Sequence, residues 1–270
     1  MAVQHNHSEM RIARIWDECE GIKTFEFDGE VDSRAGRFIM LFDPESTENP
    51  LTVSYDKPLR VMVKARGEDD GDNSFTNRLF RKKVGDRLQV TGPTGNCFAD
   101  VVDMERPLYV VMGGCGCAGQ PLLAKEAEAV RKPLWYIFGF GGRSQIPRAV
   151  REMPQHYQSI ATMDGSAGIS GDVLKAIEAV DFAKDAQAIV CGPRKMLIAA
   201  GDMLSERLGA DNVVVSLEPY MKCGRGICAS CAVDGYHVCT DGPNFRYSLL
   251  KDSPDVRLYK RGRSGALEPL

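Results

Sequence analysis

The first hundred residues show short runs of β-branched and aromatic residues separated by turn signals, a pattern that predicts β-strands. The runs cover residues 11–16, 24–27, 37–42, 51–55, 59–65 and 87–91. Several strands at this interval favour a small antiparallel β-barrel. We therefore expect residues 1–105 to form a first, barrel-like domain.

From Arg106 onward the pattern changes, because apolar runs begin to alternate with stretches of helical apolar spacing. The apolar runs are residues 108–112, 134–138, 159–162, 186–190 and 213–217, and the helical stretches are 120–131, 173–180 and 196–208. Strands that alternate with helices predict a parallel sheet covered on both faces. The expected second domain is a Rossmann-like α/β unit of residues 106–216, and residues 217–270 form a third segment.

The third segment holds four cysteines, Cys223, Cys228, Cys231 and Cys239, in the order C-x4-C-x2-C-x7-C. This is the ligand spacing of a plant-type [2Fe-2S] cluster. Glycines at positions 224 and 226 permit the tight bend that turns several thiolates toward one small cluster. A structural zinc site or unrelated buried thiols are the alternatives, although a zinc ribbon more often presents two C-x2-C pairs.

Charge and composition limit the remaining classes of function. The 270 residues include 34 basic and 37 acidic side chains, and a net charge of −3 offers no excess for binding nucleic acid. No apolar run approaches the roughly 18 residues of a membrane helix, and the first residues lack the pattern of a secretory signal. Nine cysteines then indicate reduced thiols and metal ligation in the cytoplasm, not a disulfide framework.

Three glycine-containing turns follow predicted strands of the second domain. Residues 113–121 form a glycine-rich turn that lets backbone N–H groups approach a dinucleotide diphosphate. This turn departs from G-x-G-x-x-G, and a turn without a ligand is an equally ordinary interpretation. Residues 164–168 and 191–196 add two turns at the sheet edge where open α/β sheets bind ligands. The candidate NAD-binding residues are Gly113, Gly114, Cys115, Gly116, Asp164, Gly165, Cys191, Gly192 and Pro193.

The order of these motifs resembles that of a known superfamily. Residues 50–54 and 92–96, followed by the three turns, are similar to the ferredoxin-NADP reductase superfamily. Within it, residues 216–224 and 238–245 resemble the electron-transfer subunits of NAD-dependent, class B dihydroorotate dehydrogenases. The resemblance runs from about residue 11 to residue 245, and the cysteine stretch is its most specific part.

The resemblance implies that the barrel binds FAD. A family stretch R-P-[LIM]-[ST] lies along the flavin and corresponds here to residues 49–52, with asparagine in place of the arginine. A charge contact to the FAD diphosphate must then come from elsewhere, with Lys64 and Arg66 as candidates. Both threonines also have a purely structural interpretation. Thr52 is alternatively an ordinary strand residue, and Thr76 alternatively caps the start of a helix. The implied FAD-binding residues are Asn49, Pro50, Leu51, Thr52, Val63, Lys64, Ala65, Phe75 and Thr76.

The resemblance also implies a division of labour. An FMN-containing catalytic subunit oxidises dihydroorotate, and electrons cross the [2Fe-2S] cluster and FAD of this chain to NAD+ in UMP biosynthesis. Two copies of each subunit form a heterotetramer, and this chain needs no catalytic acid or base of its own. Tyr220, Met221, Ile227 and Phe245 are candidates for the partner interface or, equally, for packing around the cluster.

Two other functions stay open at this point. A related NAD(P)H-linked reductase subunit can serve another acceptor, such as a hydrogenase, a sulfite reductase or a glutamate synthase-like partner. A non-catalytic redox-sensing module is the second. The sequence does not decide between NAD and NADP, because Arg143 and Arg148 are either surface residues or partners of a 2′-phosphate.

Overall fold

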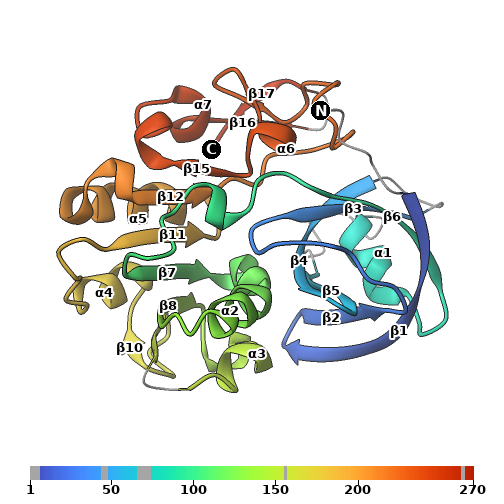
Figure 1. The fold of residues 1–270 in the computed structure, drawn as a ribbon, viewed down its shortest axis with the longest axis horizontal. Helices are drawn as coiled ribbons and strands as arrows, with labels where there is room; N and C mark the ends of the chain where they lie inside the picture. The colour runs from blue at the N-terminus through green and yellow to red at the C-terminus, as the bar shows by residue number, and fades with distance from the viewer. Residues whose placement is uncertain (1–6, 44–47, 66–73, 155–156, 263–264) are drawn as a thin grey trace.

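A computed structural model describes residues 7–43, 48–65, 74–154, 157–262 and 265–270. A closed barrel lies beside a seven-stranded sheet, and the C-terminal segment packs across the end of the sheet (Figure 1). The predicted fold class, an antiparallel barrel followed by a parallel-sheet domain and a cysteine-bearing segment, is confirmed. None of the described helices is both long and apolar enough to cross a membrane.

The barrel has the strand order β1-β2-β5-β4-β3-β6, and every pair within it is antiparallel. Its strands are β1 (His7–Cys19), β2 (Ile22–Phe27), β3 (Phe38–Phe42), β4 (Glu48–Asp56), β5 (Leu59–Lys64) and β6 (Arg87–Thr94). Buried side chains such as Phe25, Ile39 and Val61 fill its interior. Helix α1 (Phe75–Arg81) begins where the Ser74 side chain accepts a hydrogen bond from the backbone N–H of Asn77.

The sheet has the order β10-β9-β8-β7-β11-β12-β15. Its strands are β7 (Leu108–Gly113), β8 (Leu134–Phe140), β9 (Gln158–Thr162), β10 (Ile169–Ser170), β11 (Gln187–Cys191), β12 (Val213–Ser216) and β15 (Asn244–Arg246). All pairs are parallel except β12 with β15. The carboxyl ends of the parallel strands therefore meet at one edge of the sheet.

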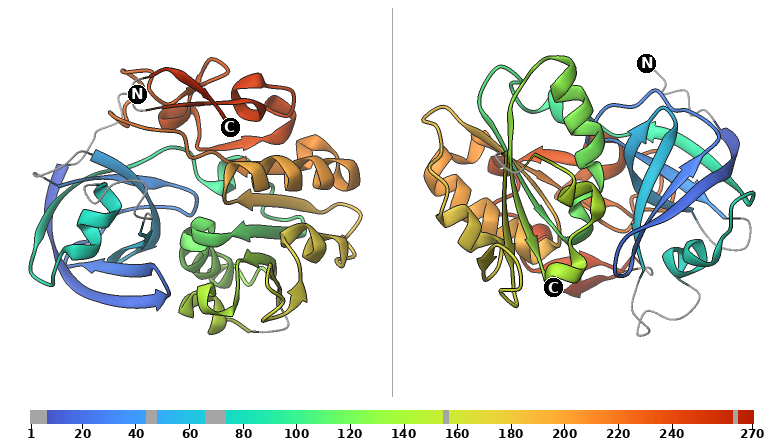
Figure 2. Two further views of the ribbon diagram at one scale, coloured as in Figure 1. Left: turned by 180° about the vertical axis from the view of Figure 1, so that it is seen from behind. Right: turned by 90° about the horizontal axis from the view of Figure 1, so that it is seen from below.

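Helices cover both faces of this sheet (Figure 2). The helices are α2 (Gln120–Ala129), α3 (Arg148–Arg151), α4 (Val173–Glu178) and α5 (Arg194–Leu208), with short 3-10 turns at η2 (Phe98–Asp100), η3 (Gly114–Gly119), η4 (Arg143–Gln145), η6 (Ala210–Asn212) and η7 (Tyr247–Leu249). Leu122 and Leu123 of α2 belong to the same apolar core as the barrel, so α2 packs between the two domains. Leu197 and Leu204 of α5 belong to a second core on the other face.

The C-terminal segment is built from short elements. They are β13 (Ala232–Val233), β14 (Tyr236–His237), α6 (Val238–Asp241), α7 (Pro254–Arg257), β16 (Tyr259–Arg261) and β17 (Leu267–Pro269). Asn244, on β15, donates its backbone N–H to Oδ1 of Asn96 at 3.0 Å, and Nδ2 of Asn96 donates to the carbonyl oxygen of Asn244 at 2.8 Å. This reciprocal pair joins the segment after the last barrel strand to the edge strand of the sheet.

Candidate functional site: a dinucleotide cavity and a cysteine loop

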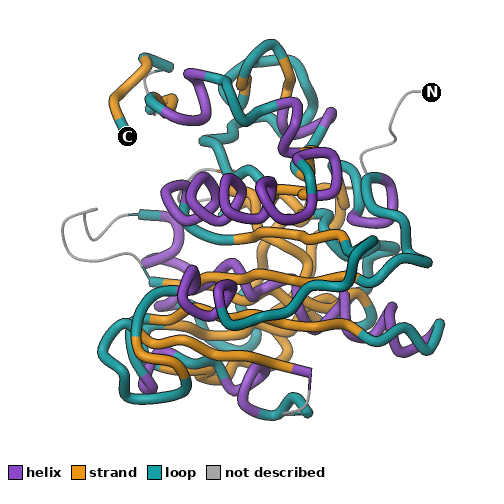
Figure 3. The backbone as a smooth tube through the Cα atoms, turned by 90° about the vertical axis from the view of Figure 1, so that its left-hand side faces the viewer, coloured by secondary structure: helices purple, strands orange, loops and turns teal. Residues whose placement is uncertain are grey.

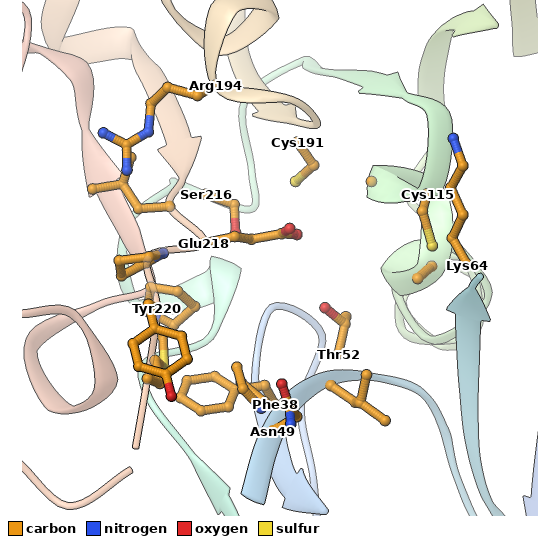
Figure 4. Close-up of a pocket in the computed structure, with 18 of the residues that line it drawn as sticks. Phe38, Asn49, Thr52, Lys64, Cys115, Cys191, Arg194, Ser216, Glu218 and Tyr220 are labelled. Carbon is orange, nitrogen blue, oxygen red and sulfur yellow. The ribbon is translucent and has the colours of Figure 1, made fainter. Parts of the chain in front are cut away.

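A cavity of about 1010 Å³ opens between the barrel and the carboxyl edge of the sheet (Figure 4). A cavity of this size lies at the upper end of the range for ligand sites. The residues predicted from the sequence that line it are Asn49, Pro50, Leu51, Thr52, Val63, Lys64, Ala65, Phe75, Thr76, Cys115, Gly116 and Cys191. All nine residues predicted to bind FAD thus line one cavity, together with residues of two glycine turns. Arg66, the other candidate for a charge contact, lies outside the described residues.

The strand pairing explains how the barrel residues reach the cavity. Strand β4 pairs with β3, so that Pro50 lies opposite Met40 and Thr52 opposite Phe38. Val63 and Lys64 end β5, which is a neighbour of β4 in the barrel. Thr52 faces the cavity from the barrel side, and Cys115 faces it from the sheet side (Figure 4).

The remaining predicted residues of the first and third turns lie just behind the cavity wall. Gly113 and Gly192 sit where β7 and β11 end, and a Cβ atom added to either would collide with Met196. A Cβ at Gly116 would lie 2.5 Å from the carbonyl oxygen of Cys191. These glycines therefore allow the two turns to approach each other closely. Gly114 and Pro193 are likewise not among the lining residues.

Asp164 and Gly165 form a separate turn after β9, also outside the cavity lining. Oδ1 of Asp164 accepts hydrogen bonds from the Ser166 hydroxyl at 2.6 Å and from the Ser166 backbone N–H at 2.9 Å. These bonds, led by the Ser166 hydroxyl, lower the pKa of Asp164. Nε of Arg143 donates to the Ser166 carbonyl oxygen at 3.0 Å, so this arginine is held at the same turn.

Glu218 is a cavity residue that the sequence analysis quoted within a motif without assigning it a role. It follows β12, and its carboxyl group projects into the cavity, where it is exposed (Figure 4). Desolvation by the cavity walls raises its pKa above the ordinary value. The signal that points to it is a carboxylate placed at the carboxyl end of a buried strand.

Two thiols line the cavity near this carboxyl group. Burial, reinforced by the negative charge of Glu218, raises the pKa of both Cys115 and Cys191 to about 12. Both thiols are therefore protonated at neutral pH. They contribute polarizable, uncharged surface to the cavity and do not act as thiolate nucleophiles.

Further lining residues are ones that the sequence analysis did not single out, although Arg194 lies within the predicted turn of residues 191–196. Arg194 begins α5, and its Nη1 donates to the carbonyl oxygens of Asp255 at 3.0 Å and Val256 at 3.4 Å. Burial lowers the pKa of its guanidinium, although the group stays charged. Strands β16 and β17 add Lys260, Arg261 and Glu268 to the lining, and Gly262 and Leu270 directly follow the two strands.

The four predicted cluster cysteines lie in one loop system between β12 and β15. The thiols of Cys223 and Cys228 contact each other, as do those of Cys231 and Cys239. The backbone N–H of Arg225 points at Sγ of Cys223 at 3.4 Å, and the N–H of Gly226 points at Sγ of Cys239 at 3.2 Å. The backbone conformation that makes this possible has positive φ angles of 61° at Gly224 and 71° at Gly226.

The ionisation of these thiols follows from the same contacts. Burial opposes ionisation of Cys228, but hydrogen bonds with Ser230 and Cys223 lower its pKa to about 7. The hydrogen bond with Cys239 lowers the pKa of Cys231 to about 6 and raises the pKa of Cys239. Within the second pair, Cys231 thus loses its proton readily while Cys239 retains it.

This donor set fits an iron-sulfur cluster in its chemistry. Four thiols and amide donors aimed at sulfur are what a [2Fe-2S] cluster requires. Across the described residues, no group of three or more His, Cys, Asp or Glu side chains is arranged to hold a single metal ion. Each iron of a [2Fe-2S] cluster takes two cysteine ligands, so the two thiol pairs suit its two irons.

The four candidate interface residues occupy different environments. Met221 and Phe245 are buried and belong to the core on the α5 side of the sheet. Tyr220 is half-buried and lines the cavity. Ile227 is 78% exposed and lies next to the exposed Cys228. Packing therefore accounts for Met221 and Phe245, while Ile227 remains available to a partner.

Comparison with known proteins gives consistent results. The iron-sulfur cluster binding domain of dihydroorotate dehydrogenase B matches residues 218–251. The probable dihydroorotate dehydrogenase B (NAD(+)), electron transfer subunit of Pyrococcus abyssi is 35% identical over 96% of this chain and 97% of its own length. The protein of the same description from Pyrococcus furiosus is 35% identical over 96% of this chain and 98% of its own length.

Solved structures show the same architecture. The structure described as the NADH-dependent reduced ferredoxin-NADP oxidoreductase superposes with a TM-score of 0.72 and 25% identity, covering 91% of this chain and 92% of the other. The ferredoxin reductase in carbazole 1,9a-dioxygenase superposes with a TM-score of 0.67 and 18% identity, covering 79% and 69%. The second likeness, at this identity, concerns the fold alone.

Proposed function

This chain belongs to the family of electron transfer subunits of dihydroorotate dehydrogenase B, and we propose how its own residues perform that role. It is an oxidoreductase subunit that passes electrons from the catalytic subunit through a [2Fe-2S] cluster and FAD to NAD+. When bound, FAD exchanges a hydride with the nicotinamide and single electrons with the cluster. The protein residues bind, orient and shield these groups.

The observation that carries the residue assignment is the contact between the cysteine loop and the flavin side of the barrel. Met40 pairs with Pro50 on the neighbouring strand, and a Cβ added to Gly224 would lie 2.6 Å from Cγ of Met40. The loop that begins at Cys223 thus rests on the strand next to the predicted flavin residues. Electron transfer needs a short gap between cofactors, and this packing would keep a cluster held by the loop close to a flavin held by the barrel.

The barrel side of the cavity is the proposed flavin site. Residues 49–52 and 63–65 form its wall, and Phe75 and Thr76 close one end. With FAD bound, Thr52 would offer its hydroxyl to a polar edge of the flavin ring. Lys64, exposed to the cavity, offers the first cation on this side.

The sheet side is the proposed nicotinamide site. Cys115 and Cys191 face the cavity across from Thr52 (Figure 4), and Gly116 also lines it. Gly116 keeps the two turns close together, because a Cβ there would collide with the carbonyl oxygen of Cys191. Glu218, with its raised pKa, holds a proton to higher pH than an exposed glutamate does and can donate a hydrogen bond to a carboxamide oxygen. The turn at Asp164 and Gly165 is the proposed ribose contact at the far end of NAD+.

The cysteine loop is the proposed cluster site and docking surface. Cys223, Cys228, Cys231 and Cys239 are the four ligands, of which Cys228 is exposed. Family membership implies a catalytic partner subunit. We infer that this partner carries FMN, docks against Ile227 and Cys228, and joins a heterotetramer of two copies of each subunit. All nine cysteines are free thiols, which supports a reducing, cytoplasmic setting.

The visible absorption spectrum of anaerobically purified protein, before and after one equivalent of NADH, tests the cofactor assignment. Flavin and iron-sulfur bands are expected together, and both should lose intensity on addition of NADH. Iron-sulfur bands without flavin would contradict the assignment of the barrel residues. A bound flavin that NADH fails to reduce would favour a redox-sensing module.

A second electron partner is a specific alternative, because the described ferredoxin-NADP oxidoreductase structure also covers 91% of the chain. Co-purification of the chain with its neighbour subunits distinguishes the two. Dihydroorotate-dependent reduction of NAD+ by the complex is the expected activity. If the complex does not catalyse this reaction but transfers electrons from NADH to another acceptor, the result would favour the alternative.

A further inference from the structure

A β-hairpin at the end of the described chain lines the cofactor cavity. We call it the C-terminal hairpin, formed by β16 (Tyr259–Arg261) and β17 (Leu267–Pro269). It lies beyond residues 218–251, which match the iron-sulfur domain. In Figure 3 the hairpin, next to the C-terminus, projects from the body of the sheet domain. Its cavity-lining residues include Lys260, Arg261 and Glu268.

The hairpin is held in place by hydrogen bonds along its length. The N–H of Gly262 donates to the carbonyl oxygen of Ala266 at 2.9 Å, and the N–H of Leu270 donates to that of Leu258 at 3.0 Å. Nε of Arg261 donates to the carbonyl oxygen of Ala232 at 3.2 Å, which ties the hairpin to the cysteine-bearing segment. The hairpin is thus seated on the same segment that carries the predicted cluster ligands.

The lining of the cavity has an excess of positive charge. Four of its side chains are cationic: Lys64, Arg194, Lys260 and Arg261. Two are acidic, Glu218 and Glu268, so basic side chains outnumber acidic ones by two, and half of the basic ones come from the hairpin. The barrel stretch of residues 49–52 contributes no charged side chain. A cavity of this kind favours an anionic ligand.

We propose that the C-terminal hairpin completes the dinucleotide site, with Lys260 and Arg261 binding the oxygens of a dinucleotide diphosphate. Arg261 has guanidinium N–H groups beyond those that hold the hairpin, and a guanidinium binds phosphate oxygens through paired hydrogen bonds. Lys260 Nζ lies 3.8 Å from Oε2 of Glu268. The bound diphosphate displaces this weak ion pair. The inference rests on the proposed function, because it takes the cavity to be a dinucleotide site.

Both FAD and NAD+ contain a diphosphate, so the test has two arms. In the first, the purified full chain is freed of flavin and titrated with FAD, and binding is followed by quenching of flavin fluorescence. In the second, the FAD-loaded chain is titrated with NAD+. Each arm compares the wild-type chain with Lys260→Gln and Arg261→Lys, and both are repeated at low and high salt.

The expected result is a loss of about tenfold in affinity for Lys260→Gln in one arm, close to the value of one charge-assisted contact. Arg261→Lys keeps the positive charge, so it should lose less affinity than a variant that removes the charge. The remaining loss arises because lysine cannot form the paired hydrogen bonds of a guanidinium. Glu268→Gln should tighten binding several-fold, because it frees Lys260 and removes a negative charge. The arm that changes identifies whether FAD or NAD+ is the source of the diphosphate.

Lys251→Gln is the matched control, because this exposed lysine lies in the same segment, pairs with Asp252 and does not line the cavity. It should leave both affinities unchanged. Circular dichroism shows whether each variant keeps its fold. Unchanged affinity of the folded Lys260 and Glu268 variants in both arms would overturn the inference while leaving the proposed function intact. A wild-type chain that binds neither dinucleotide would overturn both.

Discussion

The hydroxyl of Thr94 donates hydrogen bonds to the carbonyl oxygen of Cys239 at 3.2 Å and to that of Gly224 at 3.3 Å. Thr94 ends the last barrel strand and is buried. One side chain of the barrel therefore holds both the first and the last parts of the loop that carries the four cysteines. The position of the predicted cluster relative to the flavin wall depends on this contact.

Replacing Thr94 by valine should loosen the cysteine loop. Two buried carbonyl groups would lose a donor, a change that costs about 1–3 kcal/mol. We expect a lower thermal midpoint and a lower iron and sulfide content per chain, with FAD content nearly unchanged. Thr94→Ser keeps the hydroxyl and is the matched control. Equal cluster content in the valine and serine variants would show that the contact does not hold the loop.

Replacing Cys228 by alanine should remove the iron-sulfur bands from the visible spectrum. A [2Fe-2S] cluster needs four ligands, and Cys228 is the exposed member of the proposed set. FAD should remain bound and be reduced by NADH, because the flavin wall lies on the barrel. Cys19→Ala is the control, since Cys19 lies in β1 and outside the loop. An intact cluster spectrum in the Cys228 variant would exclude this residue as a ligand.

Asp164 should make the chain prefer NAD(H) to NADP(H). The bonds from Ser166 keep its carboxyl ionised, and a carboxylate at the end of this strand repels a 2′-phosphate. Asp164→Asn should improve use of NADPH relative to NADH by about tenfold, the usual scale of one such charge contact. The ratio of kcat/KM for the two substrates measures this preference. Ser166→Ala is a useful comparison because it loosens the turn while keeping the charge.

Glu218 should make the stability of the flavin-free protein depend on pH. Its pKa is raised in the folded state, so the folded protein binds its proton more tightly than the unfolded chain does. The resulting stabilisation is fully present below the unfolded value of 4.5 and is lost as pH rises through the higher folded value. Glu218→Gln should therefore flatten the decline of the thermal midpoint above pH 4.5.

Thermal melts of the two flavin-free proteins across this pH interval make the comparison. Parallel curves for wild type and variant would show that Glu218 titrates as an exposed carboxyl group. Repeating the melts with FAD bound shows whether the flavin changes the environment of the carboxyl group.

Much of the local structure could be predicted from the sequence. The apolar run at 108–112 became β7 (Leu108–Gly113), and the helical spacing at 196–208 became most of α5 (Arg194–Leu208). The hydrophobic periods of two residues in strands and 3.6 residues in helices involve near neighbours in the chain. They can therefore be recognised in the sequence alone. The same holds for Gly224 and Gly226, whose positive φ angles serve a bend between adjacent cysteines.

The composition of the cavity was predictable only where the family resemblance extended to it. Residues 49–52, which the resemblance implies bind FAD, line the cavity, but the motif that contains Glu218 did not reveal that its carboxyl group lines it too. No sequence pattern pointed to Lys260 and Arg261, because a short charged stretch near the chain end resembles solvent-exposed surface. Buried Met221 and exposed Ile227 also looked alike, since hydrophobicity alone does not say which apolar side chain finds a partner.

By itself the sequence determined where most strands of the barrel and the sheet and the helices α2, α4 and α5 form, where the chain bends at the cysteines, and which thiols are spaced for a cluster. These properties depend on residues a few positions apart. Only the tertiary structure decided that Asn96 meets Asn244, that β15 joins the sheet antiparallel to β12, and that the C-terminal hairpin reaches the cavity. Such contacts join segments far apart in the chain, and they form only when burial of two apolar cores brings those segments together.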